Sequence, residues 1–181
     1  MCAVLRILGV DPGLNITGYG VIEVTVGKAK LIEAGVVRGK TRGSLEARLK
    51  EIHLGIAEVI AALKPTVVAI EQLYSHYERP RTAILMGHAR GVIVLAAALA
   101  NLPVHHYAAT QVKKLVSGAG RAPKSQVQHA ICREFGLLKP PEPPDVADAL
   151  AIALCHYYTA RYDFGKQAPS VPSPRISKLT G

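Results

Sequence analysis

The stretch Leu8–Glu23 (LGVDPGLNITGYGVIE) combines a strand, a carboxylate, a turn and the start of a second strand. The apolar run that contains its beginning starts at Leu5 and ends in Asp11–Gly13 (DPG), a sequence typical of a turn. Gly18–Val26 alternates loosely and predicts a second strand, and Lys30–Arg38 predicts a third. Because only short turns separate the three segments, they predict an antiparallel meander.

Helices and strands alternate through the rest of the chain. Ser44–Leu63 has helical apolar spacing with Ser44 as its N-cap, and Thr66–Ile70 (TVVAI) is typical of a central strand. We therefore expect an α/β fold, a five-stranded mixed sheet with helices on both faces. The other predicted elements are the helices Thr82–Ala100, Thr110–Val116, Lys124–Phe135 and Asp145–Tyr158, and the strand Val104–Tyr107.

Composition limits the class of protein. The 181 residues are 49% hydrophobic, enough for one folded domain, which we assign to residues 1–162. Residues 163–181, rich in Pro and Ser, are predicted to be a disordered tail. The longest apolar run, Val92–Ala100, is far shorter than the roughly 20 residues of a membrane-spanning helix. Three cysteines without CxxC spacing, and a start without a basic leader, favour a cytoplasmic protein with no membrane attachment.

The net charge of +9 is concentrated in one segment, residues 79–133, which contains no Asp or Glu. Solvated surfaces usually mix both signs, so an acid-free basic segment predicts a polyanionic partner. A basic surface without a partner is the alternative. The basic residues of the segment are Arg79, Arg81, Arg90, Lys113, Lys114, Arg121, Lys124 and Arg133.

Four carboxylates stand where a sheet of this kind places its active site. Asp11 and Glu71 each end a predicted strand, and Asp145 and Asp148 share one face of the last helix at its start. Converging carboxylates repel one another and need cations, and oxygen ligands favour Mg²⁺ or Mn²⁺. Two such ions suit in-line phosphodiester hydrolysis that leaves a 5′ phosphate and a 3′ hydroxyl.

Each carboxylate also has a structural interpretation. Asp145 fits a helix N-cap, Asp148 fits the first turn of a helix, Asp11 fits a turn and Glu71 fits a solvated strand end. The argument for a metal site therefore rests on all four together.

Five motifs in order, from about Leu8 to about His156, resemble the RuvC family of crossover junction endonucleases. The resemblance implies a ribonuclease H-like fold, a homodimer, and metal-dependent nicking of four-way DNA (Holliday) junctions in recombination and repair. It also implies RuvA and RuvB, the branch-migration proteins, as partners. The motifs are LGVDPGLNITGYGVIE, AIEQLY, GHARGVIVLAAA, YAATQVKKLVSGAGRAPKSQVQ and DVADALAIALCH.

The resemblance also implies residue roles. Asp11, Glu71, Asp145 and Asp148 match the family's metal-binding and catalytic acids, although some relatives have His where Asp145 stands. Lys113 and Lys124 match basic residues that face DNA, and Tyr74 falls where the family has an aromatic residue that enters the junction. Together with the acid-free segment, these matches predict DNA contacts at Tyr74, Arg79, Arg81, His88, Lys113, Lys114, Arg121 and Lys124.

Three alternatives share parts of this pattern. An actin-like or sugar-kinase ATPase also opens with a strand and Asp-x-Gly, but it needs two such domains and an adenosine loop. A non-catalytic junction-binding module would keep the fold, but all four acids are present here. A small YqgF-like relative has a similar opening and fits the basic segment less well. Incubation with a four-way junction and Mg²⁺ distinguishes nicking from ATP hydrolysis.

Overall fold

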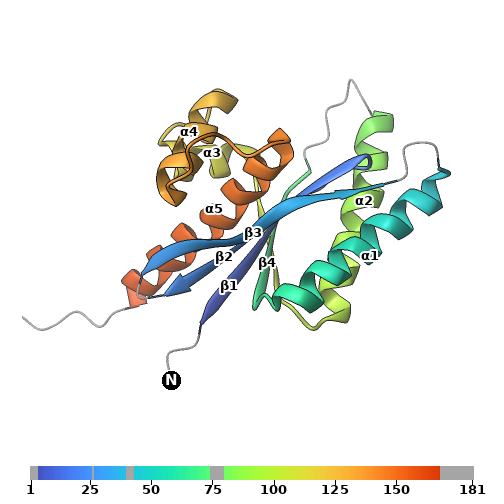
Figure 1. Ribbon diagram of the computed structural model, residues 1–181, viewed down its shortest axis with the longest axis horizontal. Coiled ribbons are helices and arrows are strands. Elements are labelled where there is room, and N and C mark those ends of the chain that lie inside the picture. Colours follow the sequence, from blue (N-terminus) through green and yellow to red (C-terminus); the bar gives the residue numbers. More distant parts are fainter. Residues whose placement is uncertain (1–3, 26, 40–42, 74–79, 168–181) are drawn as a thin grey trace, which may run out of the picture.

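The computed structural model describes residues 4–25, 27–39, 43–73 and 80–167 (Figure 1). Its centre is one five-stranded sheet, formed by β1 (Leu5–Asp11), β2 (Ile16–Thr25), β3 (Lys28–Arg38), β4 (Val67–Glu71) and β5 (Val104–Tyr107). The strand order is β3-β2-β1-β4-β5. β2 is antiparallel to β1 and β3, whereas β1, β4 and β5 pair in parallel. β1, β3, β4 and β5 therefore all end at the same edge of the sheet.

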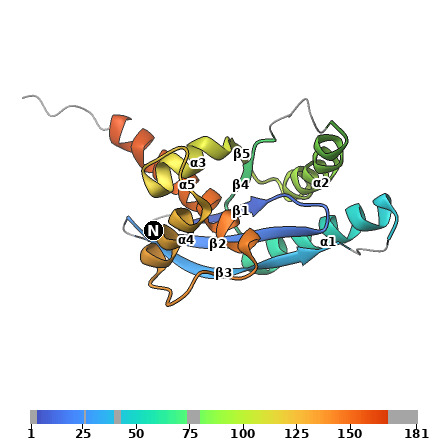
Figure 2. The ribbon, with the colours of Figure 1, turned by 90° about the horizontal axis from the view of Figure 1, so that it is seen from above.

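Helices cover both faces of the sheet, as expected (Figure 2). One face carries α1 (Leu45–Leu63) and α2 (Pro80–Leu99), and the other carries α3 (Ala109–Ser117), α4 (Lys124–Phe135) and α5 (Pro144–Gln167). The predicted mixed sheet with helices on both faces is confirmed. The side chain of Ser44 caps α1 by accepting a hydrogen bond from the backbone N–H of Ala47 at 3.4 Å.

The ends of some elements differ from the prediction. α5 continues to Gln167, past the expected end at Tyr158, because no proline interrupts the helical sequence before Pro169. Residues 163–167 are therefore helical and do not belong to the predicted tail, whose remaining part, 168–181, lies outside the described residues. β2 begins at Ile16, two residues early, because pairing with Arg38 of β3 extends it.

Alternation along the strands divides the core into two layers. On β1, Leu8 and Val10 pack toward α1 and α2, whereas Ile7 belongs to the cluster under α5. On β4, Val67 and Ala69 pack toward α5 in the same way. Since side chains alternate between faces, the last residues of the two strands, Asp11 and Glu71, also lie on the α5 side.

The α2 helix contains the stretch Arg81–Leu99, which is long and apolar enough to cross a membrane by length and composition alone. In the fold, Ala89, Ile93 and Ala97 of this helix are fully buried in the core shared with α1. Arg90, in its middle, hydrogen-bonds to the end of β4. These contacts make α2 an integral helix of the folded domain.

Candidate active site

Two carboxylates meet where neighbouring parallel strands end. In the β1–β4 pairing, Val10 lies beside Ile70, so Asp11 and Glu71 follow side by side at the same edge. Both are partly buried. The strands thus bring together two acids that are far apart in the sequence and direct both toward α5.

Glycines let α5 approach this part of the sheet closely. A Cβ atom at Gly9 would lie 2.2 Å from the carbonyl oxygen of Ala149, and one at Gly18 would lie 2.1 Å from that of Asp145. Gly18 pairs with Asp11 in the β1–β2 register, so the first turn of α5 crosses directly beside that carboxylate. The glycines of the opening motif therefore place the acids of α5 near those of the strands.

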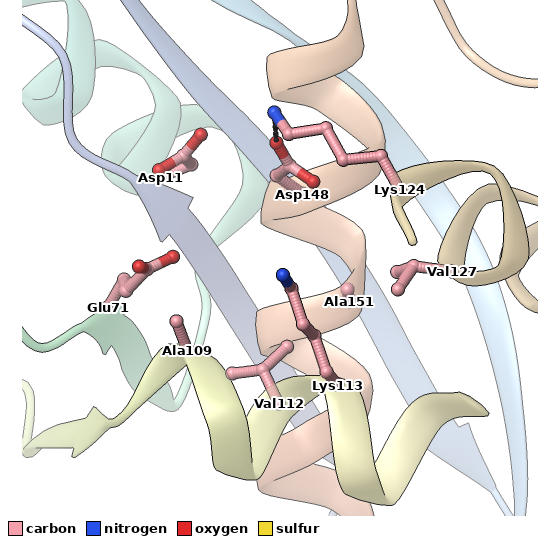
Figure 3. A pocket seen from close by; sticks show the side chains of 9 residues that line it. All are labelled: Asp11, Glu71, Ala109, Val112, Lys113, Lys124, Val127, Asp148 and Ala151. Carbon is pink, nitrogen blue, oxygen red and sulfur yellow. Dashed lines mark hydrogen bonds and ion pairs between the residues drawn. The ribbon is translucent and has the colours of Figure 1, made fainter. Parts of the chain in front are cut away.

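A pocket of about 250 Å³ lies between these elements (Figure 3). Asp11 and Glu71 face Asp148 of α5 across it, and the side chains of Lys113 and Lys124 point into it. Its apolar lining consists of Ala109, Val112, Val127 and Ala151.

Asp145, the fourth predicted acid, does not line the pocket. It is near enough for its charge to act on Asp11, whose pKa it helps to raise. The structure therefore places three of the four predicted acids in the pocket and the fourth beside it.

The positive charges near the pocket only partly balance the negative charge of its carboxylates. Burial raises the pKa of Asp11 from 3.8 to about 7, and the charges of Glu71, Asp148 and Asp145 act in the same direction. Burial also raises the pKa of Glu71, with Asp148 as the second cause. Ionised carboxylates in this position are costly without a cation.

Two lysines supply part of that compensation. The ammonium of Lys124 donates a hydrogen bond to Asp148 Oδ2 at 3.1 Å, and this contact raises the pKa of Lys124. Lys113 lowers the pKa of Glu71 by its charge, although burial of Glu71 outweighs that effect. The pocket therefore presents both acids and ammonium groups to a ligand.

The donor set suits a hard divalent cation, because only carboxylate oxygens are offered and they lack sufficient positive partners. Within the described residues, no group of three or more His, Cys, Asp or Glu side chains is gathered closely enough to form a metal cage by itself. The acids surround the pocket and leave room between them. A metal ion bound here would take part of its coordination from water or substrate.

The predicted DNA contacts fall into three groups. Lys113 and Lys124 line the pocket. Lys114 and Arg121 are exposed near it on α3 and in the α3–α4 loop, whereas Arg81 and His88 are exposed on α2. The other two, Tyr74 and Arg79, lie outside the described residues.

Sequence reasoning assigned no particular role to Arg90. Its Nε donates a hydrogen bond to the carbonyl oxygen of Glu71 at 3.2 Å, and its guanidinium contacts His106 Nδ1 at 2.6 Å. Arg90 thus ties α2 to the ends of β4 and β5 and holds the backbone that carries Glu71. Its signals in the sequence are membership of the acid-free segment and of the motif GHARGVIVLAAA.

A mixed sheet with acids and lysines over its strand ends is the arrangement that metal-dependent nucleases of the ribonuclease H-like class use. The model of the family "Crossover junction endodeoxyribonuclease RuvC" matches residues 7–156. The chain belongs to this family of Holliday junction endonucleases.

Individual relatives agree with the family match. RuvC of Rhodopirellula baltica is 57% identical over 154 residues, which cover 85% of this chain and 86% of the relative. RuvC of Alkaliphilus metalliredigens is 43% identical over 86% of this chain and 94% of the relative. The structure of Thermus thermophilus RuvC in complex with Holliday junction substrate superposes with a TM-score of 0.82 at 34% identity, covering 88% and 96% of the two chains. The yeast mitochondrial resolvase Ydc2, at 12% identity and a TM-score of 0.61, shares the fold.

These relationships confirm the ribonuclease H-like fold and identify the protein as an endodeoxyribonuclease. They favour the nuclease over the ATPase alternative. RuvC-family nucleases are metal-dependent and act in recombination and DNA repair.

Proposed function

We propose that this chain resolves Holliday junctions by paired, symmetric nicks, with Asp11, Glu71, Asp145 and Asp148 as its metal-binding and catalytic acids. The observation that supports this most strongly is the pocket itself, in which acids from three separate elements face two lysines. Uncompensated acids attract divalent cations, and ammonium groups attract the phosphate that has to be cut.

The acids would hold two ions, Mg²⁺ or Mn²⁺. Asp11 and Glu71 would bind them from the strand side, and Asp148 and Asp145 would bind from the start of α5, where the charge of Asp145 acts on Asp11. Held by these acids, the metal would supply an activated water and stabilise the leaving 3′ oxygen, so that the products would be a 5′ phosphate and a 3′ hydroxyl.

The lysines would orient the scissile phosphate. Lys124 has 70% of its side chain exposed, so its ammonium can turn from Asp148 toward an incoming phosphate oxygen without unpacking any core residue. Lys113 points into the same pocket from α3. Together they would fix the phosphate between α3, α4 and α5, with the apolar lining excluding bulk water.

A wider surface would hold the junction arms. Lys114 and Arg121 lie on the same side of the sheet as the pocket, and Arg81 lies at the start of α2. Tyr74 and Arg79 complete the proposed DNA contacts and lie outside the described residues. RuvA and RuvB are the protein partners that we propose from family membership, and the cytoplasm, where the chromosome lies, is the proposed location.

We propose a homodimer formed through α2, because a junction needs two nicks in opposing strands and we find one carboxylate pocket in the part of the chain that the structure describes. The exposed side of α2 carries large apolar side chains at a spacing that forms one stripe. Ile84 is 60% exposed, Leu95 50% and Leu99 68%. A second copy packed on this stripe would supply the second pocket with twofold symmetry.

His88 and Gly91 lie on the same exposed stripe. Gly91 has no neighbouring atom within 4 Å of an added Cβ, so a partner helix could approach closely there. His88 would face the partner helix in this arrangement, which competes with its predicted DNA contact.

The proposed reaction is tested with a synthetic four-way junction labelled in turn on each strand and incubated with Mg²⁺. We expect nicks at symmetric positions in opposing strands, and nicked products that DNA ligase reseals, because resealing requires a 5′ phosphate and a 3′ hydroxyl. A linear duplex of the same sequence is the control and should remain uncut. Junction binding without nicks would support the non-catalytic alternative.

A further inference from the structure

A second hollow, of about 620 Å³, lies beside the proline-rich connection between α4 and α5. Its wall is the segment 139–144, which contributes Lys139, Glu142 and four prolines. Arg38 and Gln128 complete the lining from β3 and α4. This hollow shares no lining residue with the carboxylate pocket.

The two hollows nevertheless adjoin each other along two helices. On α4, Gln128 lies one turn after Lys124, which lines the carboxylate pocket. On α5, Pro144 lies one turn before Asp148. Residues four apart on a helix share a face and lie about 5–6 Å apart, so the second hollow begins where the first one ends.

The sheet places Arg38 at the same edge as the proposed catalytic acids. β3 runs in the same direction as β1, so Arg38 ends its strand at the edge where Asp11 ends β1. Two inter-strand spacings, about 10 Å, separate β3 from β1. Figure 2 shows the α4–α5 connection passing beside β3 before it enters α5.

The chemistry of the hollow fits a phosphodiester strand. Arg38 and Lys139 are both exposed and share the lining with one carboxylate, Glu142, so cations are in excess. Gln128 adds an amide that can donate to a phosphate oxygen. The proline rings provide rigid apolar walls against which a sugar or base can lie, and their backbone offers no N–H that must be satisfied.

We propose that this hollow binds the backbone of the junction strand next to the scissile phosphate, with Arg38 and Lys139 as the phosphate contacts. The inference rests on the proposed function. It extends the DNA path across β3, beyond the acid-free segment, since both cations lie outside residues 79–133. A strand held at both hollows is fixed on two sides of the bond to be cut.

The test compares R38A/K139A with K28A/K30A. Lys28 and Lys30 are exposed on the same strand as Arg38, β3, but near its opposite end. Lys28 lies about 33 Å from Arg38 along the strand. Both double variants lose two positive charges, so any difference between them reports location and not net charge. Junction affinity is measured between 50 and 200 mM salt in EDTA, so that no strand is cut, and melting temperature confirms folding.

We expect R38A/K139A to lower the slope of log affinity against log salt by about 1.8, two contacts at about 0.9 each. The factor by which junction affinity falls between 50 and 200 mM salt should then be about 12-fold smaller for R38A/K139A than for the wild type. In ethylation interference, ethylated phosphates beside the cut site should no longer reduce binding of this variant. K28A/K30A should keep the wild-type footprint, and Glu142→Gln should strengthen binding.

The outcomes separate the inference from the proposed function. Failure of the wild type to bind junctions would contradict the proposed function itself. Wild-type binding with the same slope and footprint in R38A/K139A and K28A/K30A would overturn the inference. With that second result, a protein partner would be the remaining candidate for binding in the hollow.

Discussion

The two faces of the sheet are covered by helices of opposite character. On α5, Ala147, Ala149, Leu150 and Ala153 are all completely buried. On α2, buried side chains alternate with large apolar ones that are exposed, such as Leu99. The position of α5 is fixed by close packing within the chain, whereas α2 has an apolar side that the rest of the chain leaves exposed.

This difference separates two tasks. A helix that carries catalytic acids, the role proposed for α5, has to be held within a fraction of an ångström, and α5 packs backbone to backbone over glycines. A helix that joins two subunits, the role proposed for α2, has to keep an apolar surface for the partner. Arg90 links the two sides, because it reaches from α2 to the strand end that carries Glu71.

The largest effect is expected from filling the contact under α5. In Gly9→Ala, the new Cβ would lie 2.2 Å from the Ala149 carbonyl oxygen and 2.7 Å from the Ala153 nitrogen, so α5 would have to move. We expect a loss of about 3–5 kcal/mol in the free energy of unfolding, measured by urea denaturation. The α2 control is Gly87→Ala, where an added Cβ meets nothing within 4 Å. It should stabilise the helix by about 0.5–1 kcal/mol. Equal effects at the two glycines would remove the contrast between the helices.

Removing the Asp11 charge should stabilise the metal-free protein. The folded pKa, about 7, lies above the ordinary value of 3.8, so the folded state binds the proton more tightly than the unfolded state. Stability is therefore lost as pH rises from about 4 to about 7, and the full loss is present above that window. Asp11→Asn should recover up to about 4 kcal/mol at pH 8 in EDTA and flatten this pH dependence.

Thermal unfolding of Asp11→Asn between pH 4 and pH 8 provides the measurement. Glu58→Gln, which removes an exposed acid from α1, is the matched control and should leave the melting temperature nearly unchanged. A less stable Asp11→Asn protein at pH 8 would show that the acids are not in excess.

On the other face, a charge on the exposed side of α2 should separate subunits without unfolding them. Leu95→Glu places a carboxylate in the middle of the exposed stripe, and we expect at least a tenfold weaker dimer by sedimentation, about 1.4 kcal/mol or more. Leu54→Glu on α1, where Leu54 is 45% exposed, is the control and should leave the assembly unchanged. Circular dichroism checks the fold of both variants. A wild type that sediments as a monomer while resolving junctions would contradict the dimer.

The smallest effect concerns a single phosphate contact. Lys113→Ala should lower the salt slope of junction binding by about 0.9 and leave stability unchanged. Lys50→Ala, an exposed lysine on α1, is the control and should keep the wild-type slope. An unchanged slope in Lys113→Ala would remove Lys113 from the DNA surface.

Much of the fold follows from local pattern. β5 and α4 have the predicted bounds; a proline precedes each of them, and a glycine follows α4. Alternation along β1 and β4 also predicts that Asp11 and Glu71 meet, once the two strands are known to be parallel neighbours. The sequence predicts the end of α5 too early, at Tyr158, whereas the helix continues to Gln167, two residues before Pro169.

Other features depend on tertiary contacts that no local pattern encodes. Asp145 and Asp148 look equivalent in the sequence, yet only Asp148 lines the pocket. The role of Arg90 depends on where α2 lies relative to β4, and that of Arg38 depends on the strand order. The glycines of the opening motif were recognised as a resemblance, but their function, close approach of α5, appears only when the helix is in place.

The central claim is that acids held by α5 and the strand ends cut the junction, and Asp148→Asn tests it most directly. Nicking of a four-way junction in Mg²⁺ and junction binding in EDTA are measured on the same preparation, with Glu58→Gln as the control. We predict no detectable nicks and near wild-type affinity for Asp148→Asn, because the phosphate contacts of Lys113 and Lys124 remain. Near-normal nicking by this variant in Mg²⁺ would contradict the carboxylate site.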